Sequence, residues 1–181
     1  MRCALVLAAT LLAVAGVAQG AAAKLYPATS QDLAPTAGEI GFTTVAAFAK
    51  AKHPTGALSP GYKSGVSAIY TKGTATSPNE ALVDIYVYKT PADALRSWKY
   101  TCAKCKVASA PDGLHFKGEV GTSTTKSMFE LIAVDTCANV YFEISVTGTE
   151  AATKLETDNA TIASAIYTRA LHFGLSSCTA K

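Results

Sequence analysis

The chain has 181 residues, of which 49% are hydrophobic and 16% are charged, and its formal net charge is +3. This length corresponds to one domain and is sufficient for a real core. Lysine and arginine form no cluster denser than the loose group Lys99, Lys104 and Lys106, so nothing predicts binding to a nucleic acid or another polyanion.

The first 20 residues predict a cleaved secretory signal peptide, with the cleavage boundary between residues 20 and 23. Arg2 supplies a short basic start, and residues 3–18 form an uncharged run rich in Leu, Val and Ala. The run ends at Gln19, short of the roughly 20 apolar residues that a spanning helix needs. Cys3 lies at the wrong end for lipid attachment. We therefore expect a secreted or periplasmic product without a transmembrane segment after cleavage.

Residues 24–41, with Pro27 and Pro35, are expected to be an extended N-terminal segment without a core face, and residues 42–181 a single domain. A short helix is predicted over 43–52, where Thr43 or Thr44 offers an N-cap, Val45 and Phe48 start an apolar stripe, and Pro54 follows.

A β-hairpin is predicted next, with strands over 66–71 and 81–89 and a turn over 72–80. Strict alternation places Val83, Ile85 and Val87 on one face of the second strand and Asp84, Tyr86 and Tyr88 on the other. A helix should then begin at Pro91, with Thr90 as N-cap and an acid in the first turn. It continues along one face through Ala94, Leu95, Trp98 and Cys102.

A second hairpin is predicted over 128–134 and 140–146, and a final helix carries Leu155, Ile162 and Ile166. Residues 114–120 are expected to add one strand. The segment around Asp84 aligns with that around Glu143 at an offset of 59 residues, which suggests a doubled hairpin–helix unit; the alternative is that any strand leading into a capped helix has this pattern. These elements predict an α+β fold with four to five antiparallel strands and helices on one face.

The cysteines indicate a disulfide framework. Of five in the chain, Cys3 would leave with the signal peptide, and the remaining even set is Cys102, Cys105, Cys137 and Cys178. We expect two disulfides, with Cys102 and Cys105 each reaching a distant partner, because residues three apart on a helix do not bridge easily unless the helix ends there. The alternative is a C-x-x-C redox pair.

Catalytic and metal motifs are weak. Ser123 and Lys126 match S-x-x-K, but they lie in a predicted Gly/Thr-rich loop. The histidines (His53, His115 and His172) are scattered without ligand spacing, so no metal or cofactor is predicted. Glu130 and Glu143 are candidates for an acid pair across the second hairpin, and a polar outer face explains them equally well. Asn159 begins a glycosylation sequon, yet it lies on the apolar stripe of the final helix, where a glycan would not fit.

Tyr70, Tyr86 and Tyr88 suggest a tyrosine-bearing binding face, although a cover over that face would make them core residues. A tryptophan helix with a cysteine, a second cysteine before a strand and a closing amphipathic helix is loosely similar to small disulfide-bonded envelope sensor domains and lipoproteins of bacteria, over about the last hundred residues. These elements are generic and assign no family.

The sequence thus favours a non-enzymatic exported domain that binds a protein partner or a small envelope ligand. The alternatives are a small hydrolase whose site combines residues remote in sequence, and a thiol oxidoreductase that uses Cys102 and Cys105.

Overall fold

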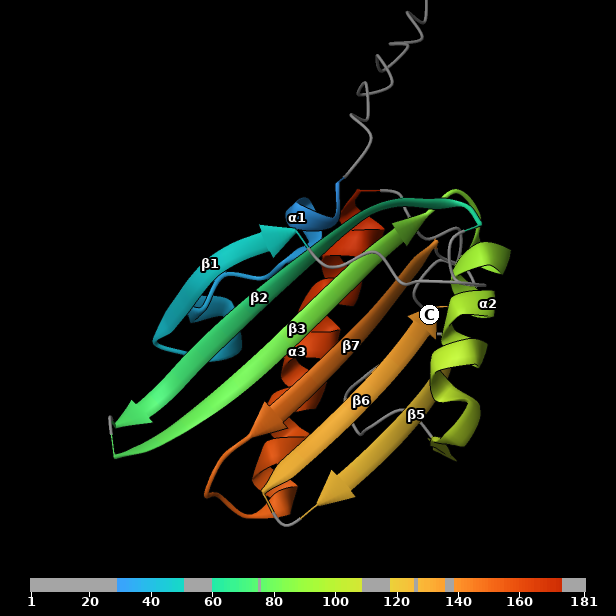
Figure 1. The fold of residues 1–181 in the computed structure, drawn as a ribbon. Helices are drawn as coiled ribbons and strands as arrows, with labels where there is room; N and C mark the ends of the chain where they lie inside the picture. The colour runs from blue at the N-terminus through green and yellow to red at the C-terminus, as the bar shows by residue number, and fades with distance from the viewer. Residues whose placement is uncertain are drawn as a thin grey trace, which may run out of the picture.

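The computed structural model describes residues 29–50, 60–74, 76–108, 118–125, 127–135 and 139–173. Its centre is a seven-stranded antiparallel sheet with the order β1-β2-β3-β7-β6-β5-β4 (Figure 1). The strands are β1 (Thr44–Lys50), β2 (Tyr62–Thr74), β3 (Ser77–Tyr88), β4 (Lys106–Ala108), β5 (Gly118–Thr125), β6 (Met128–Asp135) and β7 (Val140–Thr147). The helices are α1 (Ser30–Leu33), α2 (Pro91–Thr101) and α3 (Ala152–His172), with short 3₁₀ turns at η1 (Gly38–Ile40) and η3 (Cys102–Lys104).

Both predicted hairpins are present, so the α+β class is confirmed, but the sheet has seven strands rather than four to five. The two strands of the first hairpin pair as far as Thr74 and Ser77, so the turn expected over 72–80 is much shorter. Strand β5 overlaps the strand expected over 114–120 at residues 118–120, and residues 114–117 lie outside the described ranges. Strand β4 was not predicted, because three residues carry too little alternation.

One face of the sheet, here called the α3 face, is covered by α3. The alternate residues of β3 and β7 that point to it are Val83, Ile85, Val87, Phe142, Ile144 and Val146, and all are buried. The stripe predicted on the final helix faces them, because Leu155, Ile162 and Ile166 are each 0% exposed. This face holds most of the apolar core.

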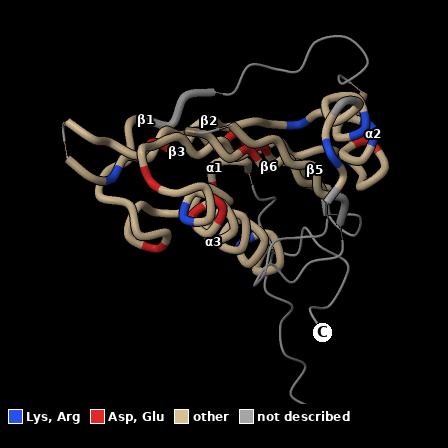
Figure 2. Tube along the Cα trace, turned by 90° about the horizontal axis from the view of Figure 1, so that it is seen from below, with Lys and Arg blue, Asp and Glu red and all other residues tan. Residues whose placement is uncertain are grey.

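The other face, here called the α2 face, carries α2 near one end of the strands. A smaller apolar cluster forms there from Tyr86, Tyr88, Ala94, Trp98, Cys102, Ile132, Val134 and Tyr141. The two helices lie on opposite sides of the sheet (Figure 2), so the prediction that helices pack on one face is wrong. Only two residues separate the end of β3 at Tyr88 from the start of α2 at Pro91. The helix packs on the face to which Tyr86 and Tyr88 point.

Two predictions near the N-terminus are also wrong. Residues 44–50 form strand β1, which pairs with β2, instead of a helix; β-branched and aromatic residues such as Val45 and Phe48 suit a strand, and pairing with a neighbour outweighs a short helical spacing. The N-terminal segment has a core face after all. Leu33, Ile40 and Phe42 are buried against the sheet and α3, and Tyr70 donates a hydrogen bond to the Pro35 carbonyl at 2.7 Å.

The predicted doubling of a hairpin–helix unit agrees with the strands of the sheet but not with the helices. Meanders β1-β2-β3 and β5-β6-β7 meet at the β3–β7 pair, where Asp84 lies directly opposite Glu143, the residue 59 positions later. Neighbours related by the same offset, Ile85 and Ile144, both point to the α3 face. The helices that follow nevertheless pack on opposite faces, so the two units do not repeat as wholes.

Candidate functional site: a carboxyl pair beside α2

The three tyrosines proposed as a binding face do not form one. Tyr86 and Tyr88 share the α2 face, but Tyr70 points to the opposite one and is 0% exposed. Tyr88 is also 0% exposed and Tyr86 is 7% exposed, so both are largely core residues. They pack in the cluster with α2 rather than under the N-terminal segment, which belongs to the α3 face. The surface available for binding on this side must therefore lie beside the tyrosines.

Local sequence fixes where α2 begins. The Asp93 amide donates to the Thr90 hydroxyl at 3.2 Å, and Pro91 occupies the first turn, so the predicted cap is confirmed. Gly61 lies against this turn with a φ of +79°, and a Cβ atom there would collide with the Asp93 carboxylate. Further along, the Trp98 indole N–H donates to the Ile132 carbonyl of β6 at 2.9 Å. Helix α2 is thus held at its first turn and in its middle.

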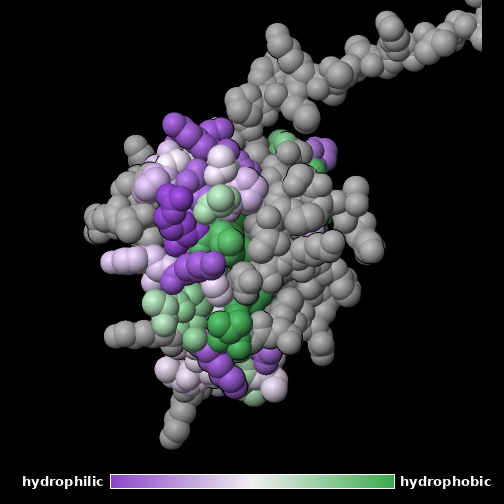
Figure 3. All heavy atoms as spheres, turned by 90° about the vertical axis from the view of Figure 1, so that its right-hand side faces the viewer, coloured by the Kyte–Doolittle hydropathy of each residue, from purple (hydrophilic) through white to green (hydrophobic). Residues whose placement is uncertain are grey.

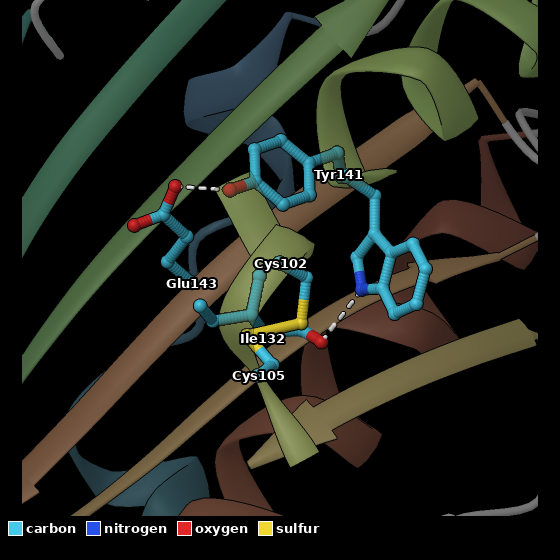
Figure 4. The surroundings of a disulfide bond; sticks show 6 residues. Cys102, Cys105, Ile132, Tyr141 and Glu143 are labelled. Carbon is cyan, nitrogen blue, oxygen red and sulfur yellow. Dashed lines mark hydrogen bonds between the residues drawn. A yellow bond between two sulfur atoms is a disulfide. The ribbon is translucent and has the colours of Figure 1, made fainter. Parts of the chain in front are cut away.

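The end of α2 carries a disulfide between Cys102 and Cys105, so the prediction that each reaches a distant partner is wrong (Figure 4). The helix ends at Thr101, and the 3₁₀ turn that follows brings the two Cα atoms to 4.7 Å. Gly121 of β5 makes the necessary room, because a Cβ atom there would overlap the Cys102 sulfur and lie 2.7 Å from the Cys105 Cβ. Cys137 and Cys178 lie outside the described residues.

Two carboxyl side chains lie on the α2 face in the same cross-strand row as Gly121. Asp84 of β3 and Glu143 of β7 are directly opposed in adjacent strands and point the same way. Cβ atoms in such a pair lie about 4.5–5.5 Å apart. The Ser67 hydroxyl, opposite Asp84 on β2, donates to the Asp84 carboxylate, and the Tyr141 hydroxyl donates to Glu143 (Figure 4). We call Asp84 and Glu143 the carboxyl pair.

Burial changes the chemistry of this pair. Loss of hydration raises the pKa of Asp84, and the hydrogen bond from Ser67 offsets part of that rise. Burial likewise raises the pKa of Glu143, as do the negative charges of Asp84 and Glu130, while Tyr141 acts in the opposite direction. Among the ion pairs of the described residues, none joins the carboxyl pair to a lysine or an arginine. The described residues therefore leave both carboxyls without a basic partner, in a chain whose net charge is positive.

The hydroxyl of Tyr141 connects the pair to α2. Burial raises its pKa, and the nearby Glu143 charge raises it further, whereas a hydrogen bond with the Thr101 side chain at the end of α2 lowers it. The ring of Tyr141 stacks on that of Tyr86, with centroids 5.4 Å apart and planes 16° from parallel. Tyr141 thus links the end of α2 to the carboxyl pair in the centre of the sheet.

Two exposed apolar residues lie beside the pair, on the side away from α2. Ile69 and Leu82 are directly opposed in β2 and β3, one row beyond Ser67 and Asp84, and are 43% and 42% exposed. Figure 2 shows acidic positions within the strands of the sheet as well as on the helices. In the part of the chain that the structure describes, the pair thus has apolar surface on both sides, buried beside α2 and exposed beyond it.

Two further exposed hydrophobic side chains lie on α2 and β4. Figure 3 shows hydrophobic side chains between hydrophilic ones on the side of the molecule that carries α2. Tyr100 of α2 and Val107 of β4 are 61% and 63% exposed. Val107 is in register with the carboxyl pair through Gly121 and Ile132, but strands β5 and β6 lie between it and Glu143, so it is a weaker candidate.

Within the described part of the chain, the other motifs do not assemble into a site. Ser123 lies in strand β5 rather than in a loop, Lys126 is outside the described residues, and so are His53 and His115; His172 is exposed at the end of α3. Asn159 is 0% exposed, and its amide donates to the carbonyls of Phe129 and Ile144 at 3.2 and 2.9 Å, which leaves no room for a glycan. Within the described ranges, no three His, Cys, Asp or Glu side chains are grouped for a metal ion.

The carboxyl pair was missed because Glu143 was expected to neighbour Glu130 within the second hairpin. Glu130 is in fact opposite Ser145, and the contact across β3 and β7 joins segments far apart in sequence. A signal was present, however. Asp84 and Glu143 are equivalent positions in the 59-residue offset, and equivalent residues meet where two such units join through antiparallel strands.

No protein-family model and no curated protein matches the sequence. Among solved structures, the fold is similar to the extracellular domain of PknH from Mycobacterium tuberculosis, with a TM-score of 0.51 and 10% identity over 80% of this chain and 99% of that one. At this identity the likeness concerns the fold alone. None of the helices in the described ranges has the length and hydropathy needed to cross a membrane.

Proposed function

We propose that this chain is an exported binding domain and that its ligand contacts the α2 face of the sheet at the carboxyl pair. The observation that carries the proposal is the opposed position of Asp84 and Glu143 in the centre of that face, partly buried and without a basic partner among the described residues. The signal peptide predicted over residues 1–20 supports export, as does the similarity of the fold to an extracellular domain.

The carboxyl pair is difficult to explain as a device for stability. Directly opposed like charges destabilise a sheet, and burial of carboxylates without a counter-ion adds to that cost. The buried acid on the α3 face has basic partners, because Asp158 forms ion pairs with both Lys72 and Lys154. Groups with strongly perturbed titration that face an accessible surface are candidates for function.

The surroundings of the pair indicate the ligand chemistry. An ammonium or guanidinium group placed between Asp84 and Glu143 would replace the lost hydration of both carboxylates and remove their mutual repulsion. Ile69 and Leu82 would accept an apolar group on the neighbouring row. A ligand with one positive charge next to an apolar part, such as a basic peptide segment, fits both features.

The test is an NMR titration of the isotope-labelled protein with a short peptide that contains arginine and leucine. The matched control peptide has glutamate in place of arginine. We expect the basic peptide to shift resonances of Ser67, Ile69, Leu82 and the carboxyl pair, and the acidic peptide to leave them unchanged. Binding should weaken with added salt, since the attraction is electrostatic.

Two variants decide whether the pair is responsible. Asp84→Asn combined with Glu143→Gln should weaken binding of the basic peptide at least about tenfold, because two charge-assisted contacts are lost. Glu156→Gln, on the exposed side of α3, should bind as the unchanged protein does. Equal affinity of the double variant and the unchanged protein would refute the proposal.

A hydrolase that uses the same two carboxyls is the second candidate, because paired carboxyls with raised pKa values can serve as acid and base. It predicts turnover of chromogenic glycosides or esters that disappears in either Asp84→Asn or Glu143→Gln. The binding proposal predicts no turnover in any of these proteins. The thiol oxidoreductase alternative predicts disulfide exchange that depends on Cys102 and Cys105 and not on the carboxyl pair.

A further inference from the structure

We infer that Asp84 and Glu143 together retain a proton in the folded protein at pH values at which the unfolded chain has lost both, so that the α2 face responds to external pH. Two like charges confined to one site cannot both ionise as readily as isolated carboxyls. The inference concerns the ligand-free protein. It therefore stands or falls separately from the proposed function, although both involve the same residues.

The register of β3 and β7 places the two carboxyl residues side by side, so that one proton can be held between them. Asp84 and Glu143 occupy one rung of the ladder, and flanking rungs Ile85–Phe142 and Val83–Ile144 pack into the α3 core on either side. The backbones on both sides are fixed by buried contacts. The backbones of Asp84 and Glu143 cannot move apart without disturbing that core, so binding a proton relieves the repulsion without a cost in packing.

Among the residues that the structure describes, the groups that face the pair from the neighbouring elements do not supply a compensating charge. On β2 they are Ser67 and, further along, Tyr62; on β3 and β7 they are the stacked rings of Tyr86 and Tyr141. Strand β6 contributes Glu130, which adds negative charge, and β5 contributes Gly121 beneath the disulfide. Helix α2 contributes Thr101 through Tyr141, while its Asp93 is engaged with Arg96 and Thr90.

The consequence for stability has a definite sign. The usual carboxyl values are 3.8 for Asp and 4.5 for Glu, and both pKa values are raised in the fold. The folded state then binds more protons than the unfolded state in the window above these values. Stability due to the pair is therefore greatest at acidic pH and declines as the pH rises through that window.

The decisive experiment follows the side-chain carboxyl carbons of Asp and Glu by NMR while the pH is varied. Asp84→Asn, Glu143→Gln and Glu156→Gln are titrated in parallel, and the urea midpoint of each protein is measured from about pH 4 to about pH 8. Asn and Gln keep an oxygen that accepts the hydrogen bonds from Ser67 and Tyr141. The variants therefore remove charge with little change of shape.

We expect Asp84 and Glu143 to titrate above their usual values, and each to move back toward its usual value when the other is neutralised. At about pH 8 both pair variants should have a higher urea midpoint than the unchanged protein, and the difference should shrink toward pH 4. Glu156→Gln should leave the profile unchanged. The inference is overturned if both carboxyls titrate at or below their usual values, or if neither pair variant gains stability at the alkaline end.

Discussion

The two faces of the sheet are built from the same strands, yet they differ in cover and in polarity. The α3 face receives a helix of 21 residues, and every strand residue that points to it from the middle of β3 and β7 is apolar and buried. The α2 face receives a helix of 11 residues near one end of the strands, and its central rung carries the carboxyl pair. The α3 face is an apolar core, whereas the α2 face carries two carboxyl groups at a partly accessible position.

One sheet can present two surfaces of different chemistry. Because side chains alternate along each strand, neighbouring residues such as Asp84 and Ile85 belong to different environments. The α3 face can supply most of the hydrophobic stabilisation while the α2 face retains an arrangement that costs stability. Four predictions test this difference between the faces.

The largest effect should come from the same substitution made on each face. Leu155→Ala empties a fully buried position under α3 and should lower the free energy of unfolding by about 2–5 kcal/mol. Leu82→Ala, at a site that is 42% exposed on the α2 face, should cost less than about 1 kcal/mol. Urea unfolding of both variants measures the difference. Similar losses for the two would mean that the α2 face is as much a core as the α3 face.

The second effect concerns the disulfide that ends α2. Gly121→Ala places a methyl group where the Cys102 sulfur lies, so it should destabilise the domain by about 1–3 kcal/mol through overpacking. Removing both sulfurs with Cys102→Ala and Cys105→Ala should reduce the additional cost of Gly121→Ala. Gly38→Ala is the matched control, because its Cβ atom meets nothing within 4 Å. An equal cost with and without the sulfurs would contradict the close approach.

Sequence patterns predicted the parts of this architecture that depend on local order. The alternation of Val83, Ile85 and Val87 and the cap at Thr90 located β3 and α2 correctly, because each is encoded within a few residues. The number of strands, the side on which α2 packs and the partner of Glu143 depend on contacts between distant segments. A single sequence does not specify such contacts directly. Here only the 59-residue offset indicated one of them, the contact between Asp84 and Glu143.

The third prediction tests the link between the carboxyl pair and α2. Tyr141→Phe removes the hydroxyl that donates to Glu143 and interacts with Thr101, so it should cost about 1–2 kcal/mol at pH 8. The pKa of Glu143 should rise further, because this hydrogen bond favours the charged form. The cost should therefore be smaller at acidic pH. Tyr100→Phe, at an exposed position of α2, should change stability by less than about 0.5 kcal/mol in urea unfolding at either pH.

The smallest effect is a pH dependence of opposite sign on the α3 side of the molecule. Glu39 accepts hydrogen bonds from the amide and hydroxyl of Thr36 at 2.6 and 2.8 Å and pairs with Arg169 at 2.6 Å, and these contacts lower its pKa to about 2. Its contribution is present above its usual value of 4.5 and is lost as the pH falls through 2.

Because the Glu39 side chain is 45% exposed, Glu39→Gln should cost only about 0.2–1 kcal/mol at neutral pH and nothing at the acid end. Urea midpoints measured from pH 2 to pH 8 should then separate two slopes: acidification weakens the contact that holds the N-terminal segment on α3, whereas it relieves the carboxyl pair on the α2 face. If Glu39→Gln left the acid slope unchanged while Asp84→Asn removed the alkaline one, titration would matter on the α2 face alone, and the contrast between the faces would be sharper than the structure indicates.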